Sequence, residues 1–267
     1  MSNRLTGPFA WLLYSITAAV IVFILAPLVV TIAISVGNTA FVAFPPRGFT
    51  LQWYRKVLHD PEFLASLAFS AGLAIAATCG AMLLGVPAAF ALARRQFPGR
   101  GAAAAALLSP LVFPVLITGV ALLQLFAMIG SNNTALNLLI AHVLVTTPYV
   151  VRTVTASLML ADIALEEAAR TLGAGRWRIL HRITVPQIAP GLAAGSLFAF
   201  MVSFDNFPIS MWLADAEHNP IPLLIFQRIA SVFEPSVAAM STLMIFIAIA
   251  VVLVVERVAG LRRAVAI

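Results

Sequence analysis

Charged side chains are scarce in this sequence. Of its 267 residues, 10% are Asp, Glu, Lys or Arg and 62% are hydrophobic. Soluble domains are about a quarter charged and roughly half apolar, so these charges are too few to cover a water-exposed surface. A single cysteine, Cys79, excludes a disulfide-stapled protein, and glycine and proline follow no short period that would indicate a fibrous one. The composition therefore predicts a polytopic membrane protein.

The patterns of common catalytic sites are also missing. A P-loop that binds ATP needs Gly-Lys-Ser/Thr, but the only lysine is Lys56, which has no such neighbours. No His-Glu-x-x-His run occurs and the four histidines are dispersed, which argues against a metal site. His142 is expected to pack with a hydrogen-bonded ring, and Cys79 to be a small buried residue. We therefore predict no catalytic residue, no metal and no cofactor in this chain, and no binding to nucleic acid.

Long stretches without a charge predict the membrane spans, since a helix needs about 20 apolar residues to cross the hydrocarbon core. The first stretch, 9–36, is too long for a cleavable signal. The longest stretch, 101–151, must fold back, and we place its turn at residues 130–134, Gly-Ser-Asn-Asn-Thr. The helix after that turn is expected to end near Arg152. The six predicted spans are 9–36, 63–93, the two halves of 101–151, 188–213 and 235–255.

The arginines predict the orientation of these spans, because cytoplasmic loops carry an excess of positive charge. With the N-terminus in the cytoplasm, twelve of the sixteen Lys and Arg residues fall inside and four outside. Both termini are then cytoplasmic. The inside residues are Arg4, Arg94, Arg95, Arg100, Arg152, Arg170, Arg176, Arg178, Arg182, Arg257, Arg262 and Arg263. Two outside segments, 51–54 and 223–232, are expected to lie in the membrane interface, or else to dock an external partner.

The cytoplasmic loop 161–186 is too long for a simple connection, which typically takes about 2–8 residues. Its first part, 162–172, has acids at the start and Arg170 near the end, as a helix dipole favours. Gly173 and Gly175 are expected to end this helix, and 176–183 to form a second short amphipathic helix. Such an exposed apolar and basic hairpin indicates a surface for another protein, unless it packs on its own bundle.

Seven positions of this loop resemble the EAA motif of binding-protein-dependent ABC importer permeases. That pattern is Glu-Ala-Ala, three residues, Gly, nine residues, Ile-x-Leu-Pro. Here it is Glu167-Ala168-Ala169, Gly173 and Ile183-Thr184-Val185-Pro186, with Val185 where leucine is usual. The resemblance implies that the hairpin 162–186 inserts into a cleft of a cytoplasmic ATPase. The residues it implicates in this coupling are Glu166, Glu167, Ala168, Ala169, Gly173, Arg176, Trp177, Ile183 and Pro186.

The same resemblance implies an all-α fold, the MetI-like type I ABC importer permease. Residues 66–257 would form its core of five transmembrane helices, with the coupling hairpin between two of them. Residues 1–65 would add an N-terminal transmembrane helix and a periplasmic segment, and 258–267 a cytoplasmic tail.

A second resemblance concerns the fifth predicted span. Residues 204–210, Phe-Asp-Asn-Phe-Pro-Ile-Ser, together with 221–223 and 234–239, are similar to spermidine/putrescine-type permeases. Asp205 is the one acid inside a predicted span, and such residues usually face a bundle interior or a water-filled path. Pro208 should break the helix beside it. We expect Phe204, Asp205, Asn206 and Phe207 to line a path for a cationic solute; alternatively, Asp205 shapes only the outer gate.

The sequence thus predicts a permease subunit, not an enzyme, that moves a small organic solute such as a polyamine by alternating access. Its expected location is a bacterial inner membrane. The expected partners are a pair of cytoplasmic ATPases that bind ATP and Mg, a homologous but different second permease, a periplasmic solute-binding protein and the lipid bilayer. Other solutes (an amino-acid derivative, an opine, a phosphonate or iron) remain open, as do, more remotely, a polytopic membrane enzyme and a channel.

Overall fold

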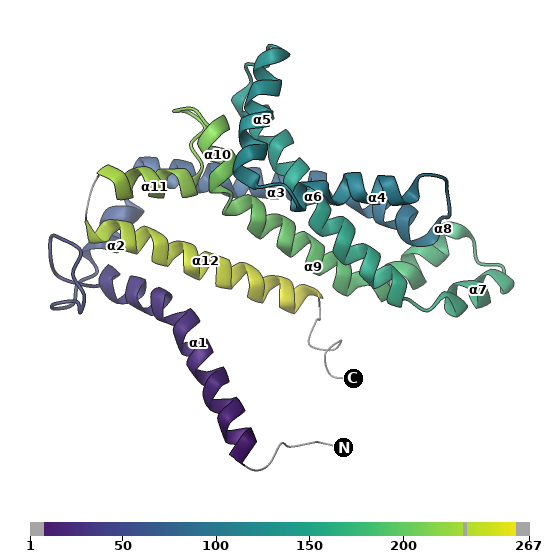
Figure 1. Cartoon of the computed structure of the whole chain (residues 1–267), viewed down its shortest axis with the longest axis horizontal. Helices are drawn as coiled ribbons and strands as arrows, with labels where there is room; N and C mark the ends of the chain where they lie inside the picture. Colours follow the sequence, from purple (N-terminus) through teal and green to yellow (C-terminus); the bar gives the residue numbers. More distant parts are fainter. Residues whose placement is uncertain (1–7, 232–233, 260–267) are drawn as a thin grey trace. The chain divides into compact units, whose positions relative to one another are not determined.

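The computed structural model describes residues 8–231 and 234–259, in which all regular structure is helical (Figure 1). The described residues form two compact units. One contains residues up to Pro61 together with 225–247, and the other contains 62–224 and the described residues from 248 onward. Most of the predicted tail, 258–267, and three of the arginines used for the orientation (Arg4, Arg262 and Arg263) lie outside the described residues.

Five helical segments are long and apolar enough to cross a membrane, and a sixth crossing is possible if one bent pair counts as a span. The all-α prediction is therefore confirmed, and the six predicted spans agree with the upper of these two counts. The long segments are α1 (Pro8–Ser35), α3 (Pro61–Arg94), α6 (Thr134–Leu160), the run Arg176–Phe204 and α12 (Pro235–Ala259).

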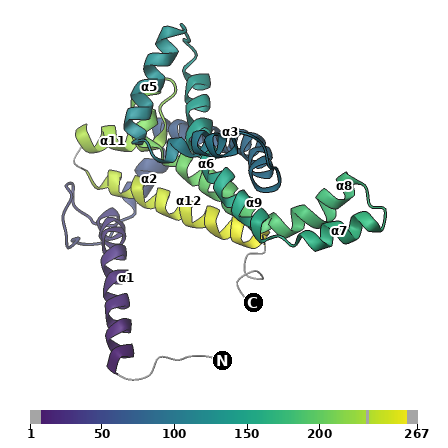
Figure 2. The same cartoon turned by 45° about the vertical axis from the view of Figure 1, so that its right-hand side comes forward.

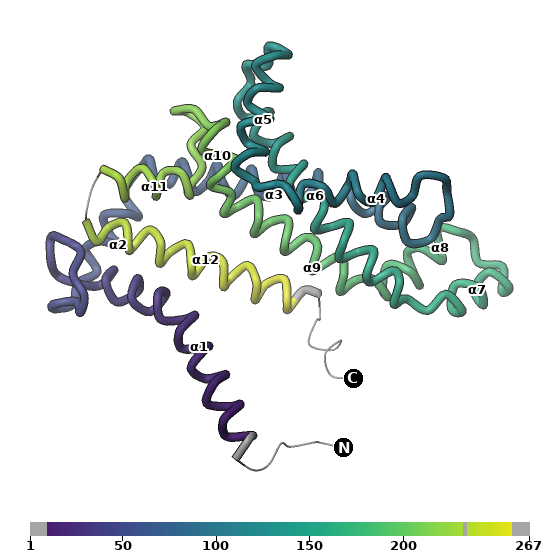
Figure 3. The backbone as a smooth tube through the Cα atoms, in the orientation of Figure 1, coloured from purple at the N-terminus to yellow at the C-terminus, as the bar shows by residue number. Residues whose placement is uncertain are grey.

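The third predicted span is the bent pair, and the expectation that this stretch turns only at residues 130–134 is wrong. It consists of α4 (Arg100–Leu108), the 3-10 turn η1 (Ser109–Leu111) and α5 (Val115–Met128), and the two arms meet at 102°. Figure 3 shows the chain turning sharply between α4 and α5. Pro110 and Pro114 explain the bend, because a proline cannot donate the helical hydrogen bond. The polar residues 130–134 were therefore not the only turn signal in this stretch.

The next helix, α6, begins where the sequence predicts but ends later. The side chain of Asn133 caps it by accepting a hydrogen bond from the backbone N–H of Leu136, at 3.0 Å. The helix then continues eight residues beyond Arg152, to Leu160. The expectation that it ends near Arg152 is wrong, because an exposed arginine on one face of a helix need not mark its end.

The fifth predicted span, 188–213, is interrupted. Helix α9 (Val185–Phe204) ends at Asp205, and a short helix, α10 (Phe207–Leu213), follows at once. Pro208 lies in the first turn of α10, where its missing N–H is tolerated. The side-chain oxygen of Asn206 caps α10 by accepting from the N–H of Ile209. The predicted break is confirmed, and it falls just before the proline.

Helices α6 and α9 run side by side in both cartoon views (Figures 1 and 2). The buried face of α9 carries small residues four positions apart: Gly191, Gly195, Ala199 and Ser203. Small residues let two helix backbones approach closely in a membrane. At the far end of this contact, Ser203 lies 2.8 Å from Nδ1 of His142 in a buried hydrogen bond. This contact confirms the packing role predicted for His142.

Two apolar clusters form the core of this unit. One joins α3, α5, α6 and α10, and the other joins α3, α6 and α9. The first consists of Leu73, Leu122, Phe126, Leu138, Ala141, Val145, Ile209 and Leu213, and the second of Ala81, Ala89, Val150, Val154, Leu158, Ile188 and Ala199. Cys79 faces away from both and is exposed, so its predicted burial is wrong. The buried face of α3 follows residues three and four apart, and position 79 lies between them.

The other unit contains α2 (Gln52–Leu58), which confirms a short helix at the predicted interface segment. Trp53 Nε1 donates to the carbonyl of Gly37 at 2.8 Å. Two ion pairs connect this region with later residues: Lys56 with Glu234 at 2.7 Å, and Asp60 with Arg228 at 3.1 Å. Arg228 belongs to α11 (Ile221–Ser231), the helix formed by the second interface segment.

Candidate functional site

The predicted hairpin follows α6. Its first arm, α7 (Ile163–Thr171), is capped by Asp162, whose Oδ1 accepts from the N–H of Ala164 at 2.9 Å. Gly173 then has φ of +80°, a left-handed conformation that glycine adopts without the steric cost of a Cβ atom. Gly175 has an ordinary φ of −69° and precedes α8 (Arg176–Ile179). Figure 2 shows α7 and α8 projecting beyond the ends of α6 and α9.

The second arm of the hairpin is not a separate helix. It starts as α8, passes through a π-helical turn, η2 (Leu180–Thr184), and continues directly into α9. The sequence predicted a separate short helix over 176–183, but the helical path continues past it, and Pro186 lies in the first turn after η2, where a proline is tolerated. Arg176–Phe204 is therefore one helical run of 29 residues, and a displacement of α8 is a displacement of the start of α9.

The outer face of the hairpin exposes large apolar side chains. Leu172 is 88% exposed, Trp177 73% and Leu165 52%. The Trp177 ring stacks on His181, with centroids 5.6 Å apart. Large apolar side chains exposed together on one short hairpin favour a contact with another protein. Six of the nine residues expected to contact an ATPase are likewise exposed: Glu167, Ala168, Gly173, Arg176, Trp177 and Pro186.

The other three are placed differently. Ala169 and Ile183 are half-buried, and Glu166 is buried, at 9% exposure. Oε1 of Glu166 accepts from Arg94 Nη2 at 3.1 Å and from Thr184 Oγ1 at 3.0 Å. Sequence reasoning missed both partners. They lie 72 and 18 residues away along the chain, and nothing in the sequence marks them.

A cavity of about 1320 Å³ lies between the end of α3 and the hairpin. Apolar side chains of α3 form one wall, and residues of α7, the glycine turn and α8 form the other. Four arginines and one acid also line it: Arg94, Arg95, Arg170, Arg176 and Glu166. The hairpin is therefore backed on this side by a hollow and not by a packed core.

At the break between α9 and α10 the four residues expected to line a path differ in exposure. Asp205 is exposed and Phe207 is half-buried. Phe204 is 3% exposed and stacks on Phe200, and Asn206 is 5% exposed with its oxygen committed to the cap of α10. Of the four, Asp205 is thus the side chain with a free polar surface.

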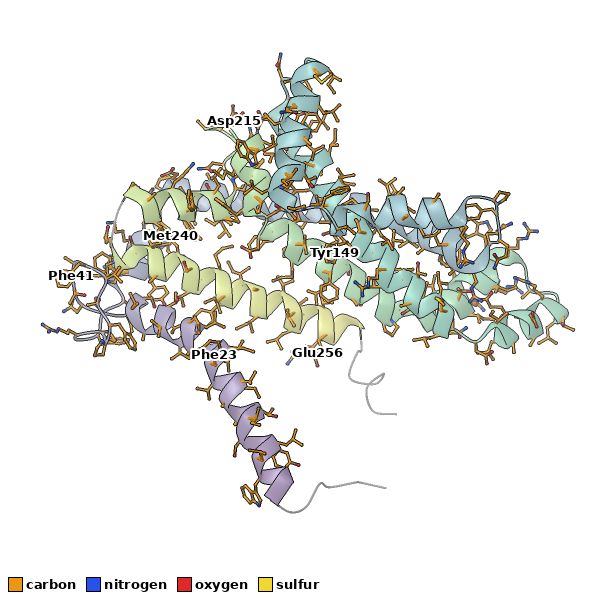
Figure 4. The ribbon with its side chains drawn as sticks, in the orientation of Figure 1. Phe23, Phe41, Tyr149, Asp215, Met240 and Glu256 are labelled. Carbon is orange, nitrogen blue, oxygen red and sulfur yellow. The ribbon has the colours of Figure 1, made fainter. Side chains whose placement is uncertain are left out.

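The loop after α10 contains a second, unpredicted carboxylate, Asp215 (Figure 4). Its Oδ1 accepts from the backbone N–H groups of Glu217 and His218, at 3.0 and 2.7 Å. A hydrogen bond from the Thr134 side chain, then that of the His218 backbone, lowers the pKa of Asp215 to about 2. Among the described residues no cluster of three or more His, Cys, Asp or Glu side chains is arranged to hold a metal ion.

Comparison with solved structures identifies the same fold. The chain superposes on a bacterial ABC transporter involved in the import of the acidic polysaccharide alginate with a TM-score of 0.73 and 19% sequence identity. The match covers 96% of this chain and 99% of that one. At this identity the likeness concerns the fold.

Sequence similarity to characterised proteins extends over most of the chain. The putrescine transport system permease protein PotI of Escherichia coli K12 is 30% identical over 230 residues, 84% of this chain and 82% of PotI. The spermidine/putrescine transport system permease protein PotC of the same strain is 27% identical over 241 residues, 90% and 91% of the two chains. The molybdate/tungstate permease WtpB of Thermococcus kodakarensis is 32% identical over 68% of this chain and 70% of WtpB.

The family model for the binding-protein-dependent transport system inner membrane component matches residues 81–262. This range includes α6, the hairpin, α9, α10 and all of α12, so the predicted motif lies inside the matched region. The chain belongs to this family: it is a transmembrane permease subunit of a binding-protein-dependent ABC importer and not an enzyme.

Proposed function

We propose that the outer face of the hairpin docks into a cytoplasmic ATPase and carries the force of ATP binding to the membrane helices. The supporting observation is the exposure of Leu172 and Trp177 beside the EAA residues of α7. An apolar surface of this kind is costly in water and is stabilised in a partner's cleft. Because α8 is continuous with α9, docking at the hairpin reaches the α9–α10 break through one continuous helical run.

The orientation follows from the same proposal. The hairpin side of the membrane is the cytoplasm, and with six crossings both termini lie there as well. The hairpin and the end of α3 carry the arginine excess that cytoplasmic segments show. The location is a bacterial inner membrane, and an external solute-binding protein meets the opposite side. A second, homologous permease chain completes the path.

The solute we propose is a polyamine. Asp205 places a carboxylate at the break between α9 and α10, where a helix end gives the path irregular backbone that tolerates polar groups. A carboxylate attracts the ammonium groups of putrescine or spermidine, and two of the relatives are named for these solutes. A carboxylate would repel molybdate, the anion for which WtpB is named.

The experiment is reconstitution of the importer in proteoliposomes with its ATPase, second permease and binding protein. We expect ATP-dependent uptake of radiolabelled putrescine. Asp205→Asn should lower it by more than tenfold, whereas Asp205→Glu should retain most of it. Uptake of molybdate in place of putrescine would refute the solute, and equal uptake by Asp205→Asn would remove Asp205 from the path.

The docking surface is tested separately in the same vesicles. Glu167→Arg should insert normally but lose co-purification with the ATPase. Gly173→Ala should also weaken coupling, because a Cβ in the left-handed region costs about 1–2 kcal/mol. Gly175→Ala is the matched control: its φ is −69° and no atom lies within 4 Å of the added Cβ. If the ATPase binds Glu167→Arg as tightly as the parent chain, this surface is not the docking site.

A further inference from the structure

The two adjacent glutamates of the hairpin have different surroundings. Glu167 is exposed on the outer face, whereas Glu166 is 9% exposed. Consecutive residues of an α-helix lie about 100° apart around its axis, so neighbouring acids can serve different surfaces. The docking surface proposed above uses Glu167, whereas Glu166, which the resemblance also implicates in coupling, is buried and does not belong to that surface.

Glu166 connects three elements through one atom. Its Oε1 accepts from Arg94, the last residue of α3, and from Thr184, the last residue of the π-helical turn before α9. The Arg94 side chain is 20% exposed and that of Glu166 12% exposed, so water screens this pair poorly. The atoms of these three residues thus join α3, α7 and the start of α9.

A second contact supports the same connection. The backbone N–H of Asp162, at the start of α7, donates to Oε1 of Gln187 in the first turn of α9, at 2.8 Å. On the side facing α3, however, the hairpin borders the cavity of about 1320 Å³. Few of the described side chains pack between α7 and α3 across this cavity. The Arg94–Glu166 contact is therefore the one that holds α7 to α3.

We infer that Glu166, Arg94 and Thr184 form a positioning clamp, in which the buried carboxylate fixes the coupling hairpin to α3 and to the start of α9. This inference rests on the proposed function, in which an ATPase moves the hairpin. With the clamp intact, the hairpin, α3 and α9 move as one body. With the clamp broken, α7 swings toward the cavity and part of the ATPase motion no longer reaches α3.

The clamp predicts a loss of coupling without a loss of assembly. In the reconstituted importer we would measure putrescine uptake per ATP hydrolysed, together with co-purification of the ATPase. Glu166→Gln and Arg94→Gln should each lower uptake per ATP by between about 5- and 150-fold, the usual range of a coupling free energy. Arg95→Gln is the matched control, since Arg95 is the next residue, is exposed and should couple normally.

The double variant Arg94→Glu with Glu166→Arg exchanges the two charges and so tests whether the ion pair itself is what matters, which the single variants do not show. It should restore a substantial part of the uptake per ATP that either single change removes. Equal coupling in Glu166→Gln, Arg94→Gln and the parent chain would overturn the clamp. The clamp would also be overturned if the single variants lost coupling and the charge exchange restored none of it.

A buried charge without its partner can prevent folding. If Glu166→Gln or Arg94→Gln fails to fold, a milder variant tests the clamp. Thr184→Val keeps the shape of the side chain and the Arg94–Glu166 pair but removes one hydrogen bond to Glu166. We expect it to assemble and to lower uptake per ATP about fivefold, at the weak end of coupling energies; unchanged uptake per ATP would overturn the clamp. Failure of the parent chain itself to bind an ATPase would instead overturn the proposed function.

Discussion

The contact between α6 and α9 makes a prediction for Gly191. A Cβ added there would lie 2.6 Å from Cβ of Ser157 and 2.9 Å from the backbone oxygen of Thr153, and it would also meet Oγ of Ser157. The Thr153 oxygen belongs to the backbone of α6 and cannot rotate away. Gly191→Ala must therefore push the two helices apart or distort one of them.

The magnitude follows from comparison with a second glycine. Gly72 of α3 has nothing within 4 Å of an added Cβ, so Gly72→Ala should only improve helix propensity, by about 1 kcal/mol. The same gain applies to Gly191→Ala but is opposed by an overpacking cost of about 1–3 kcal/mol. Taking the difference between the two variants cancels the propensity term. We expect Gly191→Ala to be less stable than Gly72→Ala by about 1–3 kcal/mol.

The assay is reversible unfolding in mixed micelles by titration with SDS, followed by circular dichroism. The double variant Gly191→Ala with Ser157→Gly should recover part of the loss, since it removes two of the three close contacts. We expect a favourable coupling energy of about 0.5–3 kcal/mol in the resulting double-mutant cycle. Equal free energies of unfolding for Gly191→Ala and Gly72→Ala would refute the close approach of α6 and α9.

Three further predictions concern polar contacts. Asn206→Ala should cost about 1 kcal/mol of unfolding free energy through loss of the α10 cap, whereas the neutral capping residue in Asn206→Ser should retain most of that stabilisation, in the same SDS titration. The pKa of Asp215 is lowered from 3.8 to about 2, so its stabilisation is complete above pH 4 and is lost as the pH falls through 2; a stability–pH profile of Asp215→Asn should lack this loss. Lys56→Ala should change stability by less than about 1 kcal/mol, with the difference vanishing at high salt, because Lys56 lies 59% exposed in its pair with Glu234.

Hydropathy was sufficient to predict most of the membrane spans. A helix that crosses lipid must be apolar over its whole length, so charge-free stretches mark the ends of α1 and α3 to within two residues and those of α12 to within four. The bent pair shows where this signal fails. Charge-free composition continues through Pro110 and Pro114, and the 102° bend depends on backbone hydrogen bonds that hydropathy does not measure.

Some features of the hairpin could likewise be predicted from the sequence and others could not. The EAA pattern and the left-handed turn at Gly173 are local, so the sequence alone predicted the hairpin, its position between α6 and α9 and the family of the chain. The inward direction of Glu166 was not predictable, because its partners Arg94 and Thr184 are neighbours only after α3, α7 and α9 have packed together. Short-range patterns fix which segments become helices, whereas the pairing of distant side chains exists only in the assembled bundle.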